Sequence, residues 1–218
     1  MSDITIVHYF DVLSSWSLIS QAALDAVTAE FGDAVTVDWR VGLFNDGAPV
    51  GESAERWAWY YRRIEAMTGV ALNPAWRDSD DDSTFVPNAV AVAARRLGAG
   101  GDAVRLALAR GAMLDGRRVQ HREVALDIAV EASGLDRDAL SVALDDRSTH
   151  AELARTTREY KALPVSVLPV FLVTNPLGDT ALLSGYFQAR TLQAVVGEAV
   201  ETMRRYDGYM AREGSDAR

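Results

Sequence analysis

The sequence predicts an α/β protein in which one β-sheet domain is interrupted by a block of helices. Three observations lead to this prediction: a strand–helix–strand unit at the start, a long middle stretch with only helical patterns, and a strand–strand–helix unit at the end. The order βαβ, helices, ββα is typical of a sheet domain that takes an insertion between its two halves. We therefore expect a discontinuous sheet domain of residues 1–52 and 161–212 and a helical domain of residues 53–160.

The first half of the sheet domain is a βαβ unit. Residues 4–10 are β-branched, aromatic and almost wholly apolar, which is typical of a strand buried on both faces. Apolar residues at helical spacing follow from Trp16 until Gly32 ends the pattern, and residues 35–41 supply a second strand. A helical crossover between two such strands predicts that they lie parallel in the sheet.

The rest of the chain contains the helical block and the second half of the sheet domain. Strands are expected at residues 169–174 and 180–184, with a hairpin turn rich in Asn, Pro and Gly between them. A last helix is expected from Ala189 to Tyr206, with a frayed polar tail after Arg212. The helices expected in the middle block are 54–67, 87–97, 103–114, 123–131, 137–144 and 149–160.

The composition excludes several kinds of site. The 218 residues include no cysteine, which rules out disulfides and thiolate zinc sites. The net charge of −9 opposes nucleic-acid binding, because nonspecific affinity comes from neutralising phosphates with Lys and Arg. No Lys or Arg occurs in the first fifteen residues, and no apolar run approaches the roughly 20 residues that span a bilayer. We expect a cytoplasmic protein without a membrane partner.

The sequence predicts no metal site. His121 and His150 have no partners at metal-ligand spacing. The acidic residues 78–83 lack the pattern of a calcium-binding loop and are expected to form a solvated link. His8 lies inside the first predicted strand, where a core histidine is the expected outcome.

The turn after the first strand is the candidate functional site. Ligands of open α/β sheets bind at the carboxyl ends of strands, where a turn into a helix exposes N–H groups. Residues 11–17 read D-V-L-S-S-W-S, so Ser14 and Ser17 have the spacing of a C-x-x-C redox motif. Two serines cannot cycle through a disulfide. A serine hydroxyl can donate to a thiolate, and it can also do no more than cap a helix.

These features resemble the DsbA-like thioredoxin superfamily, and within it the branch of kappa-class glutathione transferases and 2-hydroxychromene-2-carboxylate isomerases. In that branch the turn reads approximately D-V-x-S-P-Y-S, and a Pro opens the third strand as Leu168-Pro169 does here. The resemblance implies a thioredoxin-like sheet domain with an inserted all-helical subdomain. It also implies that the Ser14 hydroxyl binds the sulfur of glutathione and that Leu168–Pro169 is a cis-proline element facing the Ser14 turn.

One segment departs from that branch. Its members follow the hairpin with a G-S-D-R type segment that holds the γ-glutamyl end of glutathione, whereas residues 185–190 here read G-Y-F-Q-A-R. Gly185 and Arg190 are the remaining expected cofactor-binding residues of this segment. The cofactor implied is glutathione, held in another way, or another low-molecular-weight thiol such as mycothiol, and a chain without a thiol cofactor is the remaining alternative.

An aromatic cluster predicts the kind of substrate. Trp57, Trp59, Tyr60 and Tyr61 are spread around one predicted helix by their spacing, so they cannot all face one core. We expect some of them, together with Trp16 of the turn, to line a largely apolar pocket. Such a pocket favours an aromatic or conjugated small molecule over a sugar or phosphate.

The leading functional hypothesis is a cysteine-free, thiol-cofactor-dependent isomerase or transferase. The thiolate would add to a conjugated C=C bond, with Ser14, Ser17 and Asp11 as the catalytic residues. One alternative is an isomerase that uses no thiol and relies on acid/base groups such as Asp11 or His8. Another is a noncatalytic thioredoxin-like module that binds a partner beside Pro169. Enzymes of the branch are often dimers, so a homodimer is a possible assembly.

Overall fold

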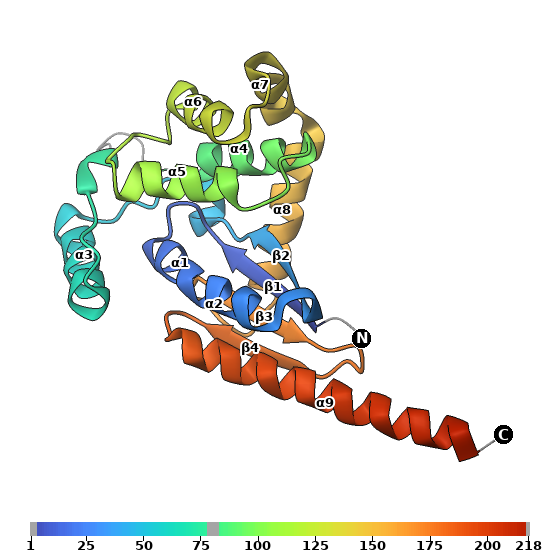
Figure 1. Ribbon diagram of the computed structural model, residues 1–218. Coiled ribbons are helices and arrows are strands. Elements are labelled where there is room, and N and C mark those ends of the chain that lie inside the picture. Colours follow the sequence, from blue (N-terminus) through green and yellow to red (C-terminus); the bar gives the residue numbers. More distant parts are fainter. Residues whose placement is uncertain (1–3, 78–82, 217–218) are drawn as a thin grey trace. The chain divides into compact units, whose positions relative to one another are not determined.

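The computed structural model describes residues 4–77 and 83–216, and within them one four-stranded sheet is accompanied by helices (Figure 1). The strand order is β2-β1-β3-β4, so the first strand lies inside the sheet, as expected of a strand that is apolar on both faces. β1 pairs antiparallel with β3, and β3 pairs antiparallel with β4 as a hairpin. The strands are β1 (Ile4–Phe10), β2 (Val35–Val41), β3 (Val170–Thr174) and β4 (Thr180–Ser184).

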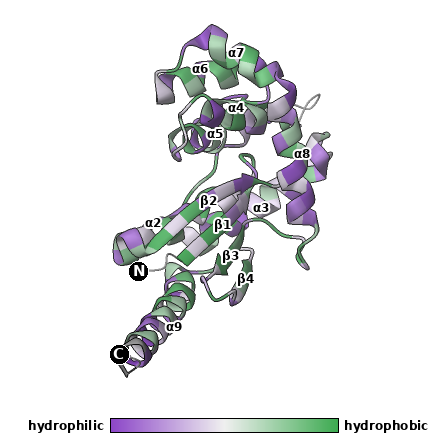
Figure 2. Ribbon diagram, turned by 90° about the vertical axis from the view of Figure 1, so that its right-hand side faces the viewer, coloured by the Kyte–Doolittle hydropathy of each residue, from purple (hydrophilic) through white to green (hydrophobic). Residues whose placement is uncertain are grey.

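The helices of the middle block begin and end close to the predicted residues. Their amphipathic character is visible as alternating hydrophilic and hydrophobic residues along α6 and α7 (Figure 2). Short 3-10 helices occur at η1 (Gly32–Ala34), η2 (Phe44–Gly47) and η3 (Pro74–Trp76). The α-helices are α1 (Ser15–Ile19), α2 (Gln21–Phe31), α3 (Ala54–Thr68), α4 (Phe85–Arg96), α5 (Ala103–Met113), α6 (Arg122–Ser133), α7 (Arg137–Asp145), α8 (Arg147–Lys161) and α9 (Ala189–Asp216).

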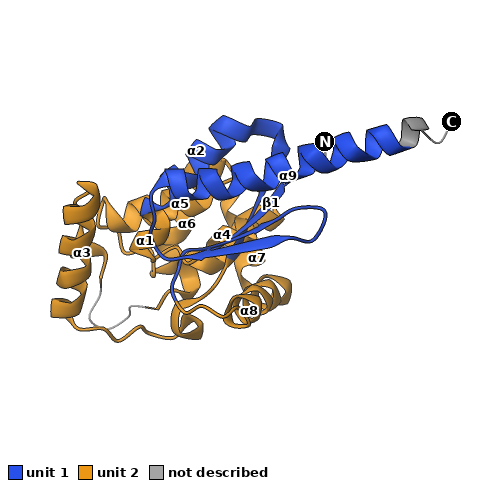
Figure 3. Ribbon diagram, turned by 90° about the horizontal axis from the view of Figure 1, so that it is seen from below, with its two compact units in different colours: residues 1–9, 19–40, 167–218 blue, residues 10–18, 41–166 orange. Residues whose placement is uncertain are grey.

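The chain forms two compact units (Figure 3). The sheet unit comprises residues 1–9, 19–40 and 167–218, and the helical unit comprises residues 10–18 and 41–166. This division differs from the expected domain ranges in one way that matters for function. The turn at residues 10–18 has its contacts in the helical unit, although it directly continues β1.

The sheet unit has one apolar core. α2 and α9 pack against each other, and α9 also contacts β3. His8 is fully buried in this unit, with its ring stacked on the ring of Phe171 at a centroid distance of 4.6 Å. This is the core position expected for it. The buried side chains of the core include Ile4, Ile6, Leu24, Val27, Val173, Leu192, Val196, Val200 and Met203.

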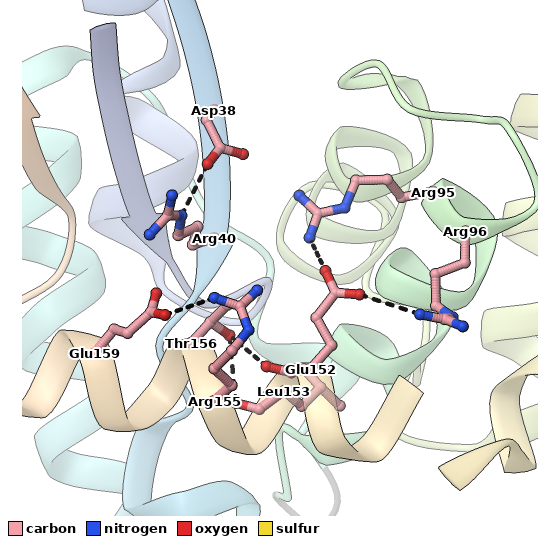
Figure 4. Close-up of polar contacts among 9 residues, drawn as sticks. All are labelled: Asp38, Arg40, Arg95, Arg96, Glu152, Leu153, Arg155, Thr156 and Glu159. Atoms are coloured by element: carbon pink, nitrogen blue, oxygen red, sulfur yellow. Dashed lines mark hydrogen bonds and ion pairs between the residues drawn. The ribbon is translucent and has the colours of Figure 1, made fainter. Parts of the chain in front are cut away.

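The helical unit is built around α4, which packs against α5, α6, α7 and α8. Residues 89–94 of α4 are all buried, as expected for a central helix that is apolar on every side. Glu152 of α8 forms ion pairs with Arg95 and Arg96 at the end of α4 (Figure 4). Because Glu152 and Arg95 are largely shielded from water, this pair is screened less than a surface ion pair.

Two helix predictions were wrong. The first helix is not continuous, because α1 ends at Ile19 and α2 begins at Gln21. The last helix does not end near Tyr206 and its tail does not fray after Arg212, since α9 continues to Asp216. The residues after Tyr206 include good helix formers and no proline, so the local preference for helix continues. The acidic segment predicted as a solvated link lies mostly outside the described part of the chain, at residues 78–82.

Gly42 offers a test of the packing against α8 within the helical unit. Its N–H donates to the carbonyl oxygen of Phe10 at 2.8 Å, and a Cβ atom at this position would lie 2.8 Å from Cγ and Cδ1 of Tyr160. Because the Tyr160 ring is buried, we expect Gly42→Ala to lower the free energy of unfolding by about 1–3 kcal/mol. Urea unfolding measures this change. Gly100→Ala is the control, since no atom lies within 4 Å of a Cβ there, and an equal loss in both variants would contradict the prediction.

Candidate functional site

The turn between β1 and α1 is organised by the Asp11 carboxyl group. Asp11 is 1% exposed. Its Oδ1 accepts a hydrogen bond from the N–H of Leu13 at 2.8 Å, and its Oδ2 accepts one from the N–H of Phe44 at 3.0 Å. Asp11 thereby joins its own turn to η2, the segment that follows β2. Each of its two carboxylate oxygens therefore accepts a hydrogen bond from a backbone N–H group, one in the turn and one in η2.

The environment of Asp11 changes the pKa of its carboxyl group. Burial raises the pKa of this carboxyl group above its ordinary value, while the hydrogen bonds from Phe44, Asn88 and Leu13 act in the opposite direction. The carboxyl group does not face solvent. This arrangement fits a residue that positions the turn rather than one that exchanges protons with a substrate.

Asn88 of α4 is the second anchor of the turn. Its side chain is fully buried, and its Oδ1 accepts a hydrogen bond from the N–H of Val12 at 3.0 Å. Its Nδ2 donates to the carbonyl oxygen of Thr84 at 2.8 Å. Asn88 is not among the site residues predicted from the sequence. The signal that could have revealed it is a lone Asn at the start of the apolar run of α4, where a buried amide needs a polar partner.

Ser14 is the N-cap of α1. Its Oγ accepts a hydrogen bond from the N–H of Ser17 at 3.2 Å, and its own N–H donates to the carbonyl oxygen of Asp11 at 2.9 Å. The side chain is 3% exposed. Among the described residues, Oγ makes no other hydrogen bond, and a hydroxyl that accepts one bond can still donate its own proton. The cap therefore orients the Ser14 hydroxyl and leaves its proton available.

The Ser17 hydroxyl is buried without a partner. The residue is 3% exposed, and no group in residues 4–77 or 83–216 hydrogen-bonds its Oγ. Leaving such a group unsatisfied costs about 1–3 kcal/mol. A ligand atom that accepted its proton would remove this cost. Ser15 lies between the two serines and is also buried, at 7% exposure.

Trp16 connects the turn with α3 through a stack of cationic and aromatic groups. The guanidinium of Arg63 lies 5.2 Å from the ring centroid of Trp16 and 5.7 Å from that of Trp59. Two turns earlier in α3, Arg56 lies over the rings of Trp59 and Tyr60. Trp59 is 45% exposed, so this stack lies at the surface of the helical unit.

Trp57 and Tyr61 occupy the interior of the same unit. They are 8% and 7% exposed and pack against the buried Trp76, whose Nε1 donates to the hydroxyl of Tyr61 at 2.6 Å. Burial raises the pKa of Tyr61 to about 12. The aromatic residues of α3 thus divide into an inner pair and an outer pair, as their spacing required. Their role as walls of a substrate pocket stays a prediction.

The remaining predicted site residues belong to the sheet unit. The Leu168–Pro169 peptide bond is cis. The N–H of Gly185 donates to the carbonyl oxygen of Pro169 at 2.8 Å, which joins the residue after β4 to the residue before β3. Arg190 lies exposed in the first turn of α9. Because Ser14 belongs to the helical unit, the approach of Pro169 to Ser14 stays a prediction.

No group of three or more His, Asp or Glu side chains in residues 4–77 and 83–216 is placed to hold a metal ion. No helix in the same ranges has both the length and the apolar character needed to cross a bilayer.

Comparison with known families identifies the fold. The DSBA-like thioredoxin domain model matches residues 5–197. The chain belongs to this family. No curated protein matches the sequence.

Solved structures support the same fold for this DSBA-like thioredoxin domain. A Nitrosomonas europaea protein, assigned provisionally as a protein disulfide isomerase, has a TM-score of 0.78 and 15% identity over 92% of this chain and 98% of its own. The cytosolic disulfide reductase DsbM of Pseudomonas aeruginosa has a TM-score of 0.70 and 22% identity over 95% and 98% of the two chains. DsbM was also solved with GSH, with a TM-score of 0.68 and 22% identity over 95% and 99%. At these identities the likeness concerns the fold.

The raised pKa of Asp11 predicts a pH-dependent contribution to stability. A folded-state pKa above 3.8 means that the folded chain holds this proton more tightly than the unfolded chain. The resulting stabilisation is complete below pH 3.8 and is lost as the pH rises through the folded-state pKa. The free energy of unfolding of the wild type minus that of Asp11→Asn should therefore decrease from about pH 4 to pH 8.

Urea unfolding at several pH values tests this expectation. Asp115→Asn, at an exposed position, is the control for the change in overall charge. A difference between wild type and Asp11→Asn that stays constant or grows with pH would show that burial does not dominate the environment of Asp11.

Proposed function

We propose that this cysteine-free DSBA-like thioredoxin domain is an isomerase or transferase that uses a small thiol, such as glutathione, on a conjugated and largely apolar molecule. The family uses the turn after the first strand for sulfur chemistry, according to the resemblance on which the site was predicted. This chain has serines where a C-x-x-C motif would have its thiols. The sulfur must then come from a cofactor.

The observation that carries the proposal is the pair of buried hydroxyls at Ser14 and Ser17. The Ser14 hydroxyl is oriented by its cap and keeps its proton for another acceptor, while the Ser17 hydroxyl has no partner in the described chain. Two hydrogen-bond donors one helical turn apart suit a single anionic sulfur atom. Hydrogen bonds to the charged form lower the pKa of a thiol and so favour the thiolate.

A structural neighbour supports the choice of thiol. DsbM was solved with GSH, so the fold that both chains share accommodates glutathione in that protein. The segment at residues 185–190 differs from the G-S-D-R type expected for kappa-class members. We therefore propose glutathione as the first thiol to test and mycothiol as the second.

The proposed reaction needs no oxidant. The thiolate sulfur forms a bond to the β-carbon of a conjugated alkene, and the electron pair of the C=C bond moves to the conjugated oxygen as an enolate. The former double bond is now single and rotates. Collapse of the enolate expels the thiolate and restores the alkene in the other geometry. Protonation of the enolate carbon before expulsion gives the thioether, which is the transferase outcome.

Asp11 supports this reaction by holding the turn. Its carboxyl oxygens accept hydrogen bonds from the backbone at Leu13 and Phe44, and its side chain is 1% exposed. A general base must come within hydrogen-bond reach of the proton that it removes. The placement of Asp11 therefore favours the thiol-dependent hypothesis over the acid/base alternative.

Substitution of the serines tests the proposal. Glutathione is added to thiol-depleted protein, with benzalacetone as a conjugated enone probe, and both thioether formation and alkene isomerisation are followed. Ser14→Ala should reduce the rate by roughly 10²–10³, because a preorganised donor to the sulfur anion is lost. The loss of its cap should cost only about 1 kcal/mol of stability. Ser17→Ala should also reduce the rate, with little loss of stability because its hydroxyl has no partner to lose.

Ser15→Ala is the matched control, since Ser15 lies in the same turn and is buried to a similar degree. The pKa of the bound glutathione thiol, followed by ultraviolet absorbance of the thiolate, gives a second readout. It should rise in Ser14→Ala and Ser17→Ala and stay constant in Ser15→Ala. Undiminished turnover in thiol-depleted Ser14→Ala protein without added glutathione would refute the thiol mechanism.

A further inference from the structure

The C-terminal part of α9 continues beyond the core of the sheet unit. α9 is 28 residues long, and Met203 is its last buried residue among those whose burial the structure describes, up to Glu213. From Arg204 to Glu213 no side chain is buried, and the helix runs past the sheet and α2 (Figures 1 and 3). An isolated helix of this length is marginal in water. A partner that covers one of its faces would stabilise it.

This exposed part carries large apolar side chains. Tyr206, Tyr209 and Met210 are 42%, 52% and 49% exposed. Both tyrosines lie on the line that runs through Val195, Ala199 and Thr202, because successive members are three or four residues apart. One face of α9 thus carries small residues in its first half and large aromatic residues in its second half.

A hollow lies on the first half of the same face. Its volume is about 470 Å³, and it lies between α9 and the β3–β4 hairpin. Its apolar lining includes Val173, Ala181, Val195 and Ala199. This volume is within the range of pockets that hold small organic molecules, so aromatic rings can enter it.

The polar groups of the two halves are complementary. The hollow is also lined by Glu198 and by Asp179, whose carboxylate accepts a hydrogen bond from the side chain of Asn175. The exposed half of α9 carries Arg205 beside its tyrosines, where it forms an exposed ion pair with Glu201 one turn earlier, a kind of pair that contributes little by itself. The tyrosine hydroxyls of this half can donate to carboxylates. The rim of the hollow is therefore acidic, and the aromatic half of the helix offers both a cation and hydrogen-bond donors.

We propose that α9 mediates a two-fold symmetric dimer in which Tyr206 and Tyr209 of each copy enter the hollow of the other. Antiparallel helices that cross near Thr202 place the aromatic half of one copy against the small-residue half of its partner. A two-fold interface uses the same surface on both copies, so each copy both gives and receives tyrosines. The second copy is the occupant because the surface is complementary to itself in size and in charge.

Sedimentation equilibrium of the full chain tests the dimer. The wild type should dimerise with a Kd on the order of micromolar, as expected for a small interface. The double variant Tyr206→Ala/Tyr209→Ala removes the inserted rings, and Thr180→Arg fills the hollow from an exposed position on β4. Each should raise the Kd by at least about tenfold. Arg204→Gln, on the opposite side of α9, is the control and should leave the Kd unchanged.

Mixing the two variants gives the sharper test. Neither variant alone can form an inserted contact, but the tyrosines of the Thr180→Arg chain can enter the intact hollow of the double tyrosine variant. The mixture should therefore form heterodimers more strongly than either variant forms homodimers. All changes are at exposed positions, and circular dichroism should show an unchanged fold.

Three results would overturn the proposal. The first is a wild type that stays monomeric at concentrations on the order of 100 μM. This result would overturn the dimer even if the hollow were found to bind a small molecule. Equal weakening by Arg204→Gln would show that the tyrosine face is not specific. Failure of the mixed variants to associate better than each alone would exclude the exchange of tyrosines between copies.

Discussion

Both oxygens of the buried Asp11 carboxyl group are occupied by backbone N–H groups, one from Leu13 and one from Phe44. These two bonds join the turn after β1 to the segment after β2. Asn88 then holds the same turn against α4 through the N–H of Val12. The position of Ser14, Trp16 and Ser17 depends on this framework, because α1 itself has only 5 residues.

The framework explains how a short helix can hold the groups of the candidate site. A five-residue helix contributes little stability of its own, since helix formation has a costly first turn. The Ser14 cap and the anchors at Asp11 and Asn88 supply the order that its length does not. The hydroxyls of Ser14 and Ser17 are thereby held in place, and such preorganisation lowers the cost of binding the thiolate proposed for this site.

The residue types of the site were predictable from the sequence, whereas their partners were not. Ser14 and Ser17 stood out through their spacing after a buried strand, and the cap of Ser14 follows from the preference of serine for helix starts. Asn88 was missed because it lies 76 residues from Val12 and no local pattern links them. The break between α1 and α2 was missed because apolar spacing alone continues across Ser20.

The sequence by itself determined the order of elements, the absence of cysteine and the membership of the helices in one long insertion, because periodicity and composition are local properties. Only the tertiary structure decided that Asp11 is buried and anchors the turn, and that Trp57 and Tyr61 lie in the interior. It also decided that α9 extends beyond the residues that pack on the core of the sheet unit. Each of these depends on which side chains exclude water from a given atom. That is a property of contacts between distant segments, and no single stretch of sequence contains it.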